Sequence, residues 1–196
     1  MRVITTHINA DFDGMASMIA AQKLYPDALV VFPGSQEKTL RDFISQTLLY
    51  KYDFLKAKQV VIPEIEMLIV VDTRSSGRIG SLASCLKNPG LEIHIYDHHP
   101  KSDGDLKGNL EVIRDVGSTT TLMTELLREK EIDINEEEAT IFGLGIYEDT
   151  GSLTHLTTCP DDLKAAAWLL EKGAKLDVIS QFVSHDLTSK QVSYLN

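Results

Sequence analysis

Three side chains that could bind a metal ion fall within seven residues near the start of the chain. The stretch HINADFDG, residues 7–14, contains His7, Asp11 and Asp13 and follows the β-rich segment RVITT. Carboxylates this close together repel one another unless their pKa values rise or a cation offsets their charge. The stretch therefore indicates either a polar turn or one part of a metal site.

Further candidate ligands follow two other segments that are expected to be strands. Asp72 follows the apolar run MLIVV, and Asp97, His98 and His99 follow the alternating segment LEIHIY. Asp149, in YEDTGS, closes a helical segment beside a glycine. In an open α/β sheet, ligands bind beyond the carboxyl ends of the strands, so we expect these side chains to meet at one edge of a sheet.

The mixture of aspartate oxygens and histidine nitrogens favours Mn²⁺, Fe²⁺, Zn²⁺ or Co²⁺ over Ca²⁺, which prefers oxygen ligands alone. These candidates outnumber the ligands that one tetrahedral ion needs, so a pair of ions about 3.5–4 Å apart is expected. Asp72 is the natural bridge between them, because it stands alone after the most apolar strand.

Several of these residues also have simpler interpretations. Asp72 alone could be a loop residue or a helix cap, and His94 alternates with apolar neighbours as a structural residue of its strand would. His155 follows Asp149 closely and is a candidate for contacting substrate. Ser118, in GSTTT, starts a helix whose N–H and hydroxyl groups could hold a phosphate or simply cap the helix.

The elements that must position these residues alternate between strands and helices. This order predicts a doubly wound, mainly parallel α/β sheet flanked by helices, with a helical C-terminal portion. The predicted strands cover residues 2–6, 28–32, 66–72, 91–97 and 110–116. The predicted helices cover residues 15–25, 39–52, 77–88, 118–130, 135–149 and 160–173.

Composition limits the classes of partner. The 196 residues fit one sizeable domain, and a net charge of −10 argues against binding duplex nucleic acid through a basic surface. The longest apolar run is too short to cross a bilayer, so no membrane partner is expected. The two cysteines, Cys85 and Cys159, lie far apart, and no secretory signal precedes them. We therefore expect free thiols in a cytoplasmic protein.

The end of the sequence suggests a boundary. We expect one domain over residues 1–182 and the start of a helical linker over residues 183–196, because TSKQVSYLN is typical of a helix that has begun and not finished. On this interpretation the chain is a fragment of a longer protein, and a further domain follows it.

Four motifs carry a resemblance to a known family. HINADFDGMAS, VVDTR, YDHHP and YEDTGS resemble, in that order, the motifs of the DHH phosphoesterase superfamily, and the match extends to about residue 182. The stretch INADFDGMASMIAAQKLYPDALVVFPGSQEK is most similar to the N-terminal DHH module of bacterial multidomain proteins. In those proteins, CBS domains and a poly(A) polymerase or tRNA nucleotidyltransferase domain follow.

The resemblance implies a site with two divalent ions, Mn²⁺ foremost, with Mg²⁺, Co²⁺ or Zn²⁺ as alternatives. It implies that one ion is held by His7, Asp11 and Asp72, and the other by Asp13, Asp72, His98 and Asp149. His99 would face the substrate phosphate and act in catalysis with Asp72, and Asp97 would orient its neighbours. One departure matters: the Gly-rich motif ending in histidine, which marks the second domain of the family's phosphodiesterases, is not found in this sequence.

The implied activity is two-metal hydrolysis of phosphate esters. We expect a phosphodiesterase or exonuclease that acts on short single-stranded oligonucleotides or related nucleotides, and a homodimer is an open alternative for its assembly. Three alternatives stay open. The module could serve a regulatory or RNA-positioning role within a larger poly(A) polymerase or tRNA nucleotidyltransferase, could be a manganese-dependent pyrophosphatase, or could bind nucleotides without catalysis.

Overall fold

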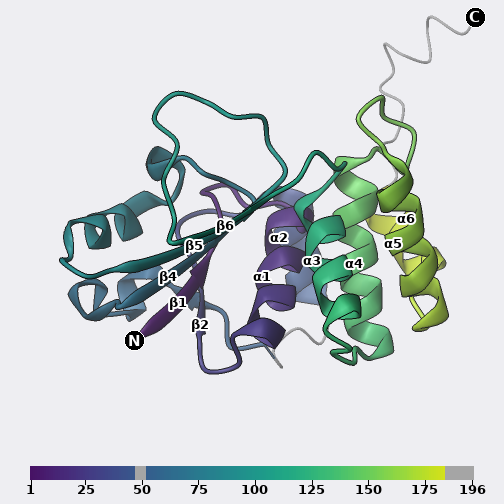
Figure 1. Cartoon of the computed structure of the whole chain (residues 1–196). Coiled ribbons are helices and arrows are strands. Elements are labelled where there is room, and N and C mark those ends of the chain that lie inside the picture. The colour runs from purple at the N-terminus through teal and green to yellow at the C-terminus, as the bar shows by residue number, and fades with distance from the viewer. Residues whose placement is uncertain (47–51, 184–196) are drawn as a thin grey trace, which may run out of the picture.

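The computed structural model describes residues 1–46 and 52–183. Within these residues, six strands form one sheet in the order β3-β2-β1-β4-β5-β6, and each neighbouring pair is parallel (Figure 1). The strands are β1 (Arg2–Thr5), β2 (Leu29–Phe32), β3 (Leu55–Lys56), β4 (Met67–Val71), β5 (Glu92–Asp97) and β6 (Leu110–Ile113). This order is typical of doubly wound sheets, which confirms the predicted fold class.

The strand order places the reversal of the sheet between β1 and β4. Thr5 pairs with Val70, and Val71 pairs with Tyr96, so the carboxyl ends of β1, β4 and β5 lie at the same edge. Ligands bind at this reversal point in doubly wound sheets, because the loops after the two strands diverge and leave a crevice. The residues that follow these three strands are the ones predicted to bind metal.

The α-helices gather on one side of the sheet (Figure 1). α1 packs against α3 and α4, while α5 and α6 pack against α4 further from the sheet. Their bounds are α1 (Phe12–Leu24), α2 (Lys38–Gln46), α3 (Thr119–Glu129), α4 (Glu136–Asp149), α5 (Pro160–Glu171) and α6 (Leu176–Val183). The predicted helical C-terminal portion is confirmed as far as Val183.

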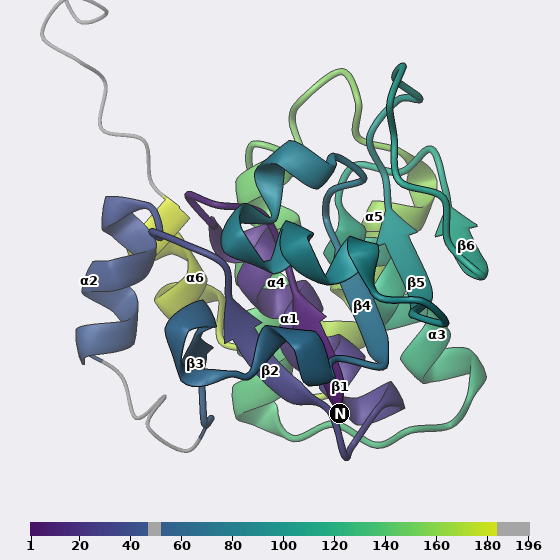
Figure 2. The same ribbon diagram turned by 90° about the vertical axis from the view of Figure 1, so that its left-hand side faces the viewer.

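The opposite face carries 3₁₀ turns, which lie in front of the strands in Figure 2. The α-helix predicted over residues 77–88 is therefore wrong: the chain forms 3₁₀ helices at Ser76–Arg78 and Gly80–Lys87. Gly80, the first residue of the second 3₁₀ helix, has a left-handed φ of 56°, and a Cβ there would lie 2.7 Å from the carbonyl oxygen of Pro33. Only glycine combines that φ with so close an approach, so a continuous α-helix cannot form.

Each face of the sheet has its own apolar core, and the alternation of strand residues divides them. In β4, Ile69 and Val71 belong to the cluster beneath α1, whereas Leu68 and Val70 belong to the cluster beneath the 3₁₀ helices. All four side chains are fully buried. This central strand is held from both sides, so the residue that follows it has a fixed position.

Several boundaries differ from the predictions. α1 begins at Phe12 rather than residue 15, because the Asp11 side chain caps it by accepting a hydrogen bond from the Gly14 N–H at 3.0 Å. The short strand β3 was not predicted. The helix expected over residues 39–52 corresponds to α2 at Lys38–Gln46, and residues 47–51 of that prediction lie outside the described residues.

The structure describes only part of the C-terminal region for which predictions were made. The proposed linker over residues 183–196 also falls outside the described residues beyond Val183. Cys85 and Cys159 are free thiols, as expected. Among the helices that the structure describes, none combines the length and apolar character needed to cross a membrane.

Candidate metal centre

The first predicted ligand group comes together where β1 and β4 end. His7 Nε2 lies 3.2 Å from Asp72 Oδ2 and 3.6 Å from Asp11 Oδ2. One ligand atom from each of the three residues lies within 4.8 Å of the others, so a single ion could contact all three. Asp11 reaches this position as the N-cap of α1, where its other oxygen accepts from Gly14.

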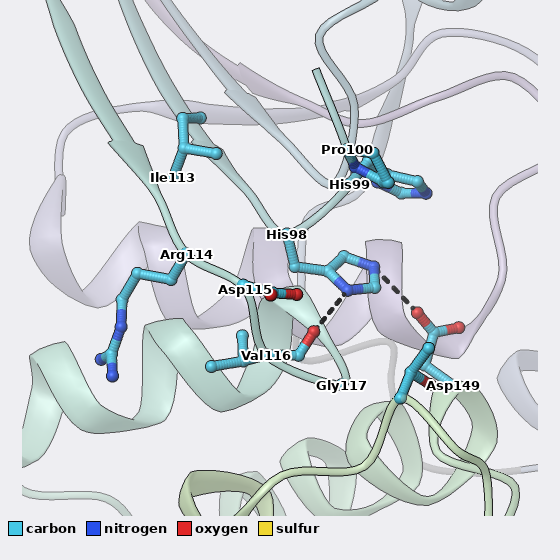
Figure 3. Close-up of a pocket in the computed structure, with 10 residues that line it drawn as sticks. His98, His99, Pro100, Ile113, Arg114, Asp115, Val116, Gly117 and Asp149 are labelled. Carbon is cyan, nitrogen blue, oxygen red and sulfur yellow. Dashed lines mark hydrogen bonds and ion pairs between the residues drawn. The ribbon is translucent and has the colours of Figure 1, made fainter. Parts of the chain in front are cut away.

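The second predicted group assembles beside it. His98 Nε2 lies 3.1 Å from Asp149 Oδ2, 3.6 Å from Asp72 Oδ1 and 4.0 Å from Asp13 Oδ2. One ligand atom from each of these four residues lies within 4.8 Å of the rest. The ring of His98 is fixed from its other side by a 3.0 Å contact between Nδ1 and the Val116 carbonyl (Figure 3).

Asp72 belongs to both groups, with Oδ2 toward His7 and Oδ1 toward His98. Its backbone is left-handed, with φ of 59°, which is uncommon for a residue with a side chain but tolerated best by Asp and Asn. The Asp72 N–H donates to the Tyr96 carbonyl at 2.9 Å, and the Thr119 hydroxyl donates to Oδ1 at 3.0 Å. These contacts hold the carboxylate between the two groups.

Asp13 is fully buried and rests on the N-terminus of α3. Its two oxygens accept hydrogen bonds from the Thr119 and Thr120 N–H groups, both at 2.8 Å. A helix N-terminus favours negative charge, so α3 receives this carboxylate where the sequence suggested a phosphate cradle. Asp13 lies in the first turn of α1, and the alternative of a simple polar turn there is wrong.

Ser118 does not reach the surface of the site. It is fully buried, and its hydroxyl caps α3 by accepting from the Thr121 N–H at 3.0 Å. Direct contact with substrate requires an exposed atom, so the capping interpretation replaces substrate binding for this residue.

The electrostatics of the cluster show an excess of buried negative charge. Burial raises the pKa of Asp13 well above its usual range, and the charges of Asp72 and Asp149 raise it further. Burial likewise raises the pKa of Asp149, and with help from the charge of Asp11 it raises the pKa of Glu148 to about 8. Without a cation, these carboxylates are relieved only by taking up protons.

The two histidines respond in the opposite sense. Burial disfavours a charged ring, but Asp11 and Asp72 outweigh it and raise the pKa of His7 to about 10. Asp149 and Asp72 similarly raise the pKa of His98 to about 9, against the effect of burial. The buried Nε2 of His98 forms no hydrogen bond with any described residue despite its short contact to Asp149. A buried nitrogen without a hydrogen bond, surrounded by carboxylates, fits a divalent ion.

His99 stands at the open side of the cluster, with its side chain 42% exposed. Its Nδ1 lies 2.7 Å from Asp97 Oδ1, and this bond raises the pKa of His99. The other oxygen of Asp97 accepts from Arg74 Nε at 2.9 Å, and Arg74 Nη2 donates to the His99 carbonyl at 2.5 Å. Asp97 and Arg74 together fix the imidazole, so Asp97 lies where an orienting residue would be needed.

His155 is exposed and lies outside both ligand groups. Its Nδ1 lies 3.1 Å from the Asp149 carbonyl oxygen, in a loop where three consecutive residues, 151–153, are left-handed. Its contact with substrate stays a prediction.

Three residues of the site were missed in the sequence. Arg74 stands in the VVDTR motif, yet only the fold shows that it reaches Asp97. Glu148 joins a further ligand group with Asp11 and Asp149, and it accepts from the Phe12 N–H at 2.7 Å. Its place next to Asp149 was the available signal.

The third missed residue is Asp162, which is fully buried behind the site. It accepts from the Gly117 N–H at 3.0 Å, the Thr121 hydroxyl at 2.6 Å and the Cys159 N–H at 2.7 Å. It therefore anchors the loop before α3 to the start of α5.

The geometry agrees with the comparison to known families. Residues 2–146 match the DHH family, N-terminal domain. The chain belongs to the DHH family. It is 52% identical over 196 residues to an A-adding tRNA nucleotidyltransferase of Geobacter sulfurreducens, which covers all of this chain and 22% of that protein. It is 36% identical over 192 residues to an A-adding tRNA nucleotidyltransferase of Aquifex aeolicus, covering 97% of this chain and 22% of that protein.

These relatives confirm the predicted relation to nucleotidyltransferase proteins, and the chain spans about a fifth of the length of the curated relatives it matches. An exopolyphosphatase-related protein from Bacteroides fragilis has a similar structure, with a TM-score of 0.76 and 21% identity. The match covers 97% of this chain and 58% of that one. It supports the fold that the strand order shows.

Proposed function

We propose that this domain hydrolyses phosphodiesters in short single-stranded oligonucleotides or related nucleotides with two divalent ions, Mn²⁺ foremost. The observation that carries the proposal is the pair of ligand groups that share Asp72, each with its ligand atoms within 4.8 Å. Asp72 presents Oδ2 to one group and Oδ1 to the other, which is the arrangement a bridging carboxylate needs. The raised pKa of Asp13 adds support, because a cluster that favours protons also favours cations.

When bound, such a pair of ions supplies Lewis acidity, lowers the pKa of water toward neutrality and offsets charge on a phosphoryl group. The protein contributes orientation. Asp13 and Asp72 are held by N–H and hydroxyl donors from α3, so neither carboxylate needs to reorganise. Preorganised groups of this kind stabilise developing charge more effectively than mobile ones.

His99 is the residue that we assign to the substrate. Asp97 holds its Nδ1, which leaves Nε2 as the ring atom available on the exposed side. From there it can donate a hydrogen bond to a phosphoryl oxygen, or a proton to the leaving oxygen. Arg74 fixes Asp97 and the backbone of His99, so the imidazole keeps one orientation.

The relatives favour a second candidate role. Because two relatives that match 97% or more of the chain are named A-adding tRNA nucleotidyltransferases, the domain could position RNA for a nucleotidyltransferase within a longer protein. The two roles differ in turnover, since positioning alone requires no hydrolysis.

The deciding experiment incubates the protein and its Asp149→Asn variant with Mn²⁺ and short RNA, short DNA, cyclic dinucleotides and pyrophosphate. Asn keeps the size of Asp149 while removing one charge beside His98. We expect the parent to hydrolyse at least one phosphodiester and the variant to lose most of that activity. Equal activity in both proteins would contradict the proposed two-ion site, and binding of RNA without turnover would favour the positioning role.

A further inference from the structure

Asp162 is a fully buried carboxylate that belongs to neither ligand group of the candidate metal centre. It is the third residue of α5, where its Oδ2 accepts from the Cys159 N–H at 2.7 Å and so caps the helix. A serine or threonine hydroxyl can cap a helix without burying a charge, and burying a carboxylate among neutral donors costs free energy. Capping alone therefore does not account for an aspartate at this position.

The other hydrogen bonds of Asp162 connect α5 to the start of α3. Both of its oxygens accept from the Gly117 N–H at 3.0 Å, and Oδ1 also accepts from the Thr121 hydroxyl at 2.6 Å. A Cβ on residue 117 would lie 2.5 Å from Asp162 Oδ2 and 2.6 Å from Thr150 Cγ2. Only glycine leaves room for so close a contact, so residue 117 is matched to the carboxylate that holds it.

The residues held in this way, 116–120, form what we call the α3 entry segment, and they support two of the aspartates in the second ligand group. Two N–H groups of the segment donate to Asp13, both at 2.8 Å. The hydroxyl of Thr119 donates to Asp72 Oδ1 at 3.0 Å. The position of these donors depends on the segment, which Asp162 ties down at both of its ends.

The α3 entry segment also supports the other two ligands of the second group. The Val116 carbonyl lies 3.0 Å from His98 Nδ1, a contact drawn in Figure 3. Gly117 packs directly against Thr150, the residue after Asp149. Each ligand of this group is therefore in contact with the segment or next to a residue that is.

The first ligand group takes its own supports from elsewhere. His7 Nδ1 lies 3.0 Å from the Ile8 carbonyl oxygen, and Asp11 accepts from the Gly14 N–H at 3.0 Å. Among the described residues, no hydrogen bond from the α3 entry segment reaches His7 or Asp11. Apart from the shared Asp72, the two groups are thus supported by different parts of the chain.

We propose that Asp162 is a positioning residue for the second ligand group, whose affinity for its ion it raises by holding the α3 entry segment in place. The inference rests on the proposed function, because it requires two bound ions that can be told apart. Residues that orient metal ligands without touching the metal typically change metal affinity about 10–100-fold when they are replaced. Replacing Asp162 should therefore weaken one ion and spare the other.

The test uses Asp162→Asn, which keeps the size of the side chain but replaces one acceptor oxygen with an NH₂ group. Asparagine cannot accept from all three donors at once. The matched control is Glu138→Gln, because Glu138 is also a buried carboxylate and the third residue of its helix, where it accepts from the Asn135 N–H at 2.9 Å. It lies at the opposite end of α4 from Asp149.

Calorimetry with Mn²⁺ measures both affinities, and the EPR spectrum of bound Mn²⁺ distinguishes a coupled pair from isolated ions. We expect Asp162→Asn to weaken one ion about 10-fold while the other changes less than about twofold, and to lose the signal of the pair where the parent is filled. Glu138→Gln should melt at a lower temperature but bind both ions as the parent does. Equal weakening of both ions, or an unchanged pair, overturns the proposal.

Double variants identify which ion is weakened. In Asp11→Asn, which removes a ligand of the first group, adding Asp162→Asn should weaken the remaining ion about 10-fold. In His98→Gln, which removes a ligand of the second group, the same addition should leave the remaining ion unchanged. The reverse pattern overturns the proposal. If Asp162→Asn does not fold, Thr121→Val removes one donor to Asp162, and we expect a loss of about 2–5-fold at the same ion; unchanged affinities there overturn the proposal equally.

Turnover separates this inference from the proposed function. On a phosphodiester that the parent hydrolyses, Asp162→Asn should be slow at low Mn²⁺ and approach the parent at saturating Mn²⁺, which a loss of stability alone would not produce. If one ion is weakened selectively and the parent hydrolyses no phosphodiester, the hydrolytic function fails and the positioning role stands. If both ions bind Asp162→Asn as they bind the parent, the positioning role is wrong whatever the turnover.

Discussion

Two polar clusters of this protein both combine histidine with carboxylates but differ in how their residues are paired. One is the candidate metal centre at the carboxyl edge of the sheet, called the metal centre below. The other, which we call the Tyr25 network, consists of Tyr25, Glu92, His94 and Tyr96. It forms one chain of contacts, from Glu92 Oε1 to His94 Nε2 at 2.9 Å, from His94 Nδ1 to the Tyr25 hydroxyl at 2.6 Å, and on to the Tyr96 hydroxyl at 2.6 Å.

The difference lies in whether each group finds a complementary partner. In the Tyr25 network a carboxylate meets an imidazole, the imidazole meets a hydroxyl, and burial raises the pKa of Tyr25, which keeps its hydroxyl neutral as a donor. In the metal centre, Asp13 faces the charges of Asp72 and Asp149, and a buried imidazole nitrogen has no hydrogen bond among the described residues. A cluster whose polar groups all find hydrogen-bond partners within it is typical of a structural role. A cluster that leaves buried polar groups without such partners indicates a binding site for a ligand or ion.

The largest expected effect comes from Asp72→Asn, which removes the charge that the two ligand groups share. Asn tolerates the left-handed backbone of residue 72 and can keep the hydrogen bond from Thr119. We expect turnover to fall at least about 1000-fold, since metal-assisted charge stabilisation contributes several kcal/mol. Calorimetry should show Mn²⁺ stoichiometry falling from two ions to at most one.

The matched control is Glu92→Gln, which neutralises a carboxylate in the Tyr25 network instead. It should leave Mn²⁺ stoichiometry and turnover as in the parent. In EDTA, Asp72→Asn should be no less stable to heat than the parent, because it relieves repulsion on Asp13. An unchanged stoichiometry in Asp72→Asn would remove the distinction between the clusters.

A smaller effect is expected from pH in the metal-free protein. The pKa of Glu148 is raised from 4.5 to about 8 in the folded chain. The folded state therefore holds this proton more tightly, so its contribution to stability is complete below pH 4.5 and is lost as pH rises through about 8. His7 and His98, whose pKa values are also raised, give a slope of the same sign.

The variant Glu148→Gln isolates the contribution of this carboxylate to the pH dependence of stability. Gln cannot ionise, and its side-chain oxygen can still accept from the Phe12 N–H. In EDTA at pH 8 we expect the variant to melt about 3–8 °C above the parent, with the difference shrinking as pH falls and vanishing below pH 4.5. Thermal melts across this range measure it, and two parallel curves would show that Glu148 carries no excess charge.

The sequence predicted which candidate ligands come together better than it predicted the residues that support them. Asp72, Asp97 and His98 could be placed because each lies at or directly after the end of a strand, and the ends of parallel strands share an edge. Arg74 could not be placed, because its contact with Asp97 depends on how two loops pack, and Asp162 reaches Gly117 across 45 residues. Long-range contacts of this kind leave no local pattern in the chain.

The secondary structure was likewise predicted well in some elements and missed in others. The long strands and α-helices carry periodic patterns that a sequence displays. Strand β3 has only two residues, too few for a period, and the turns at Gly80–Lys87 have an apolar pattern that a 3₁₀ helix shares with an α-helix. The role of Ser118 was open in the sequence because capping and phosphate binding require the same residue types.

The smallest expected effect comes from Tyr25→Phe, which removes the central hydroxyl of the Tyr25 network. The loss leaves His94 Nδ1 and the Tyr96 hydroxyl without this partner, and we expect it to cost about 1 kcal/mol, or about 2–4 °C in Tm. Tyr147→Phe is the control, because the Tyr147 hydroxyl forms no hydrogen bond with the described residues, and it should melt as the parent does. Neither variant should change Mn²⁺ stoichiometry or kcat/KM, since the network satisfies itself without an ion. A loss of Mn²⁺ from Tyr25→Phe alone would show instead that the two clusters are coupled through β5, whose Tyr96 carbonyl accepts from the Asp72 N–H.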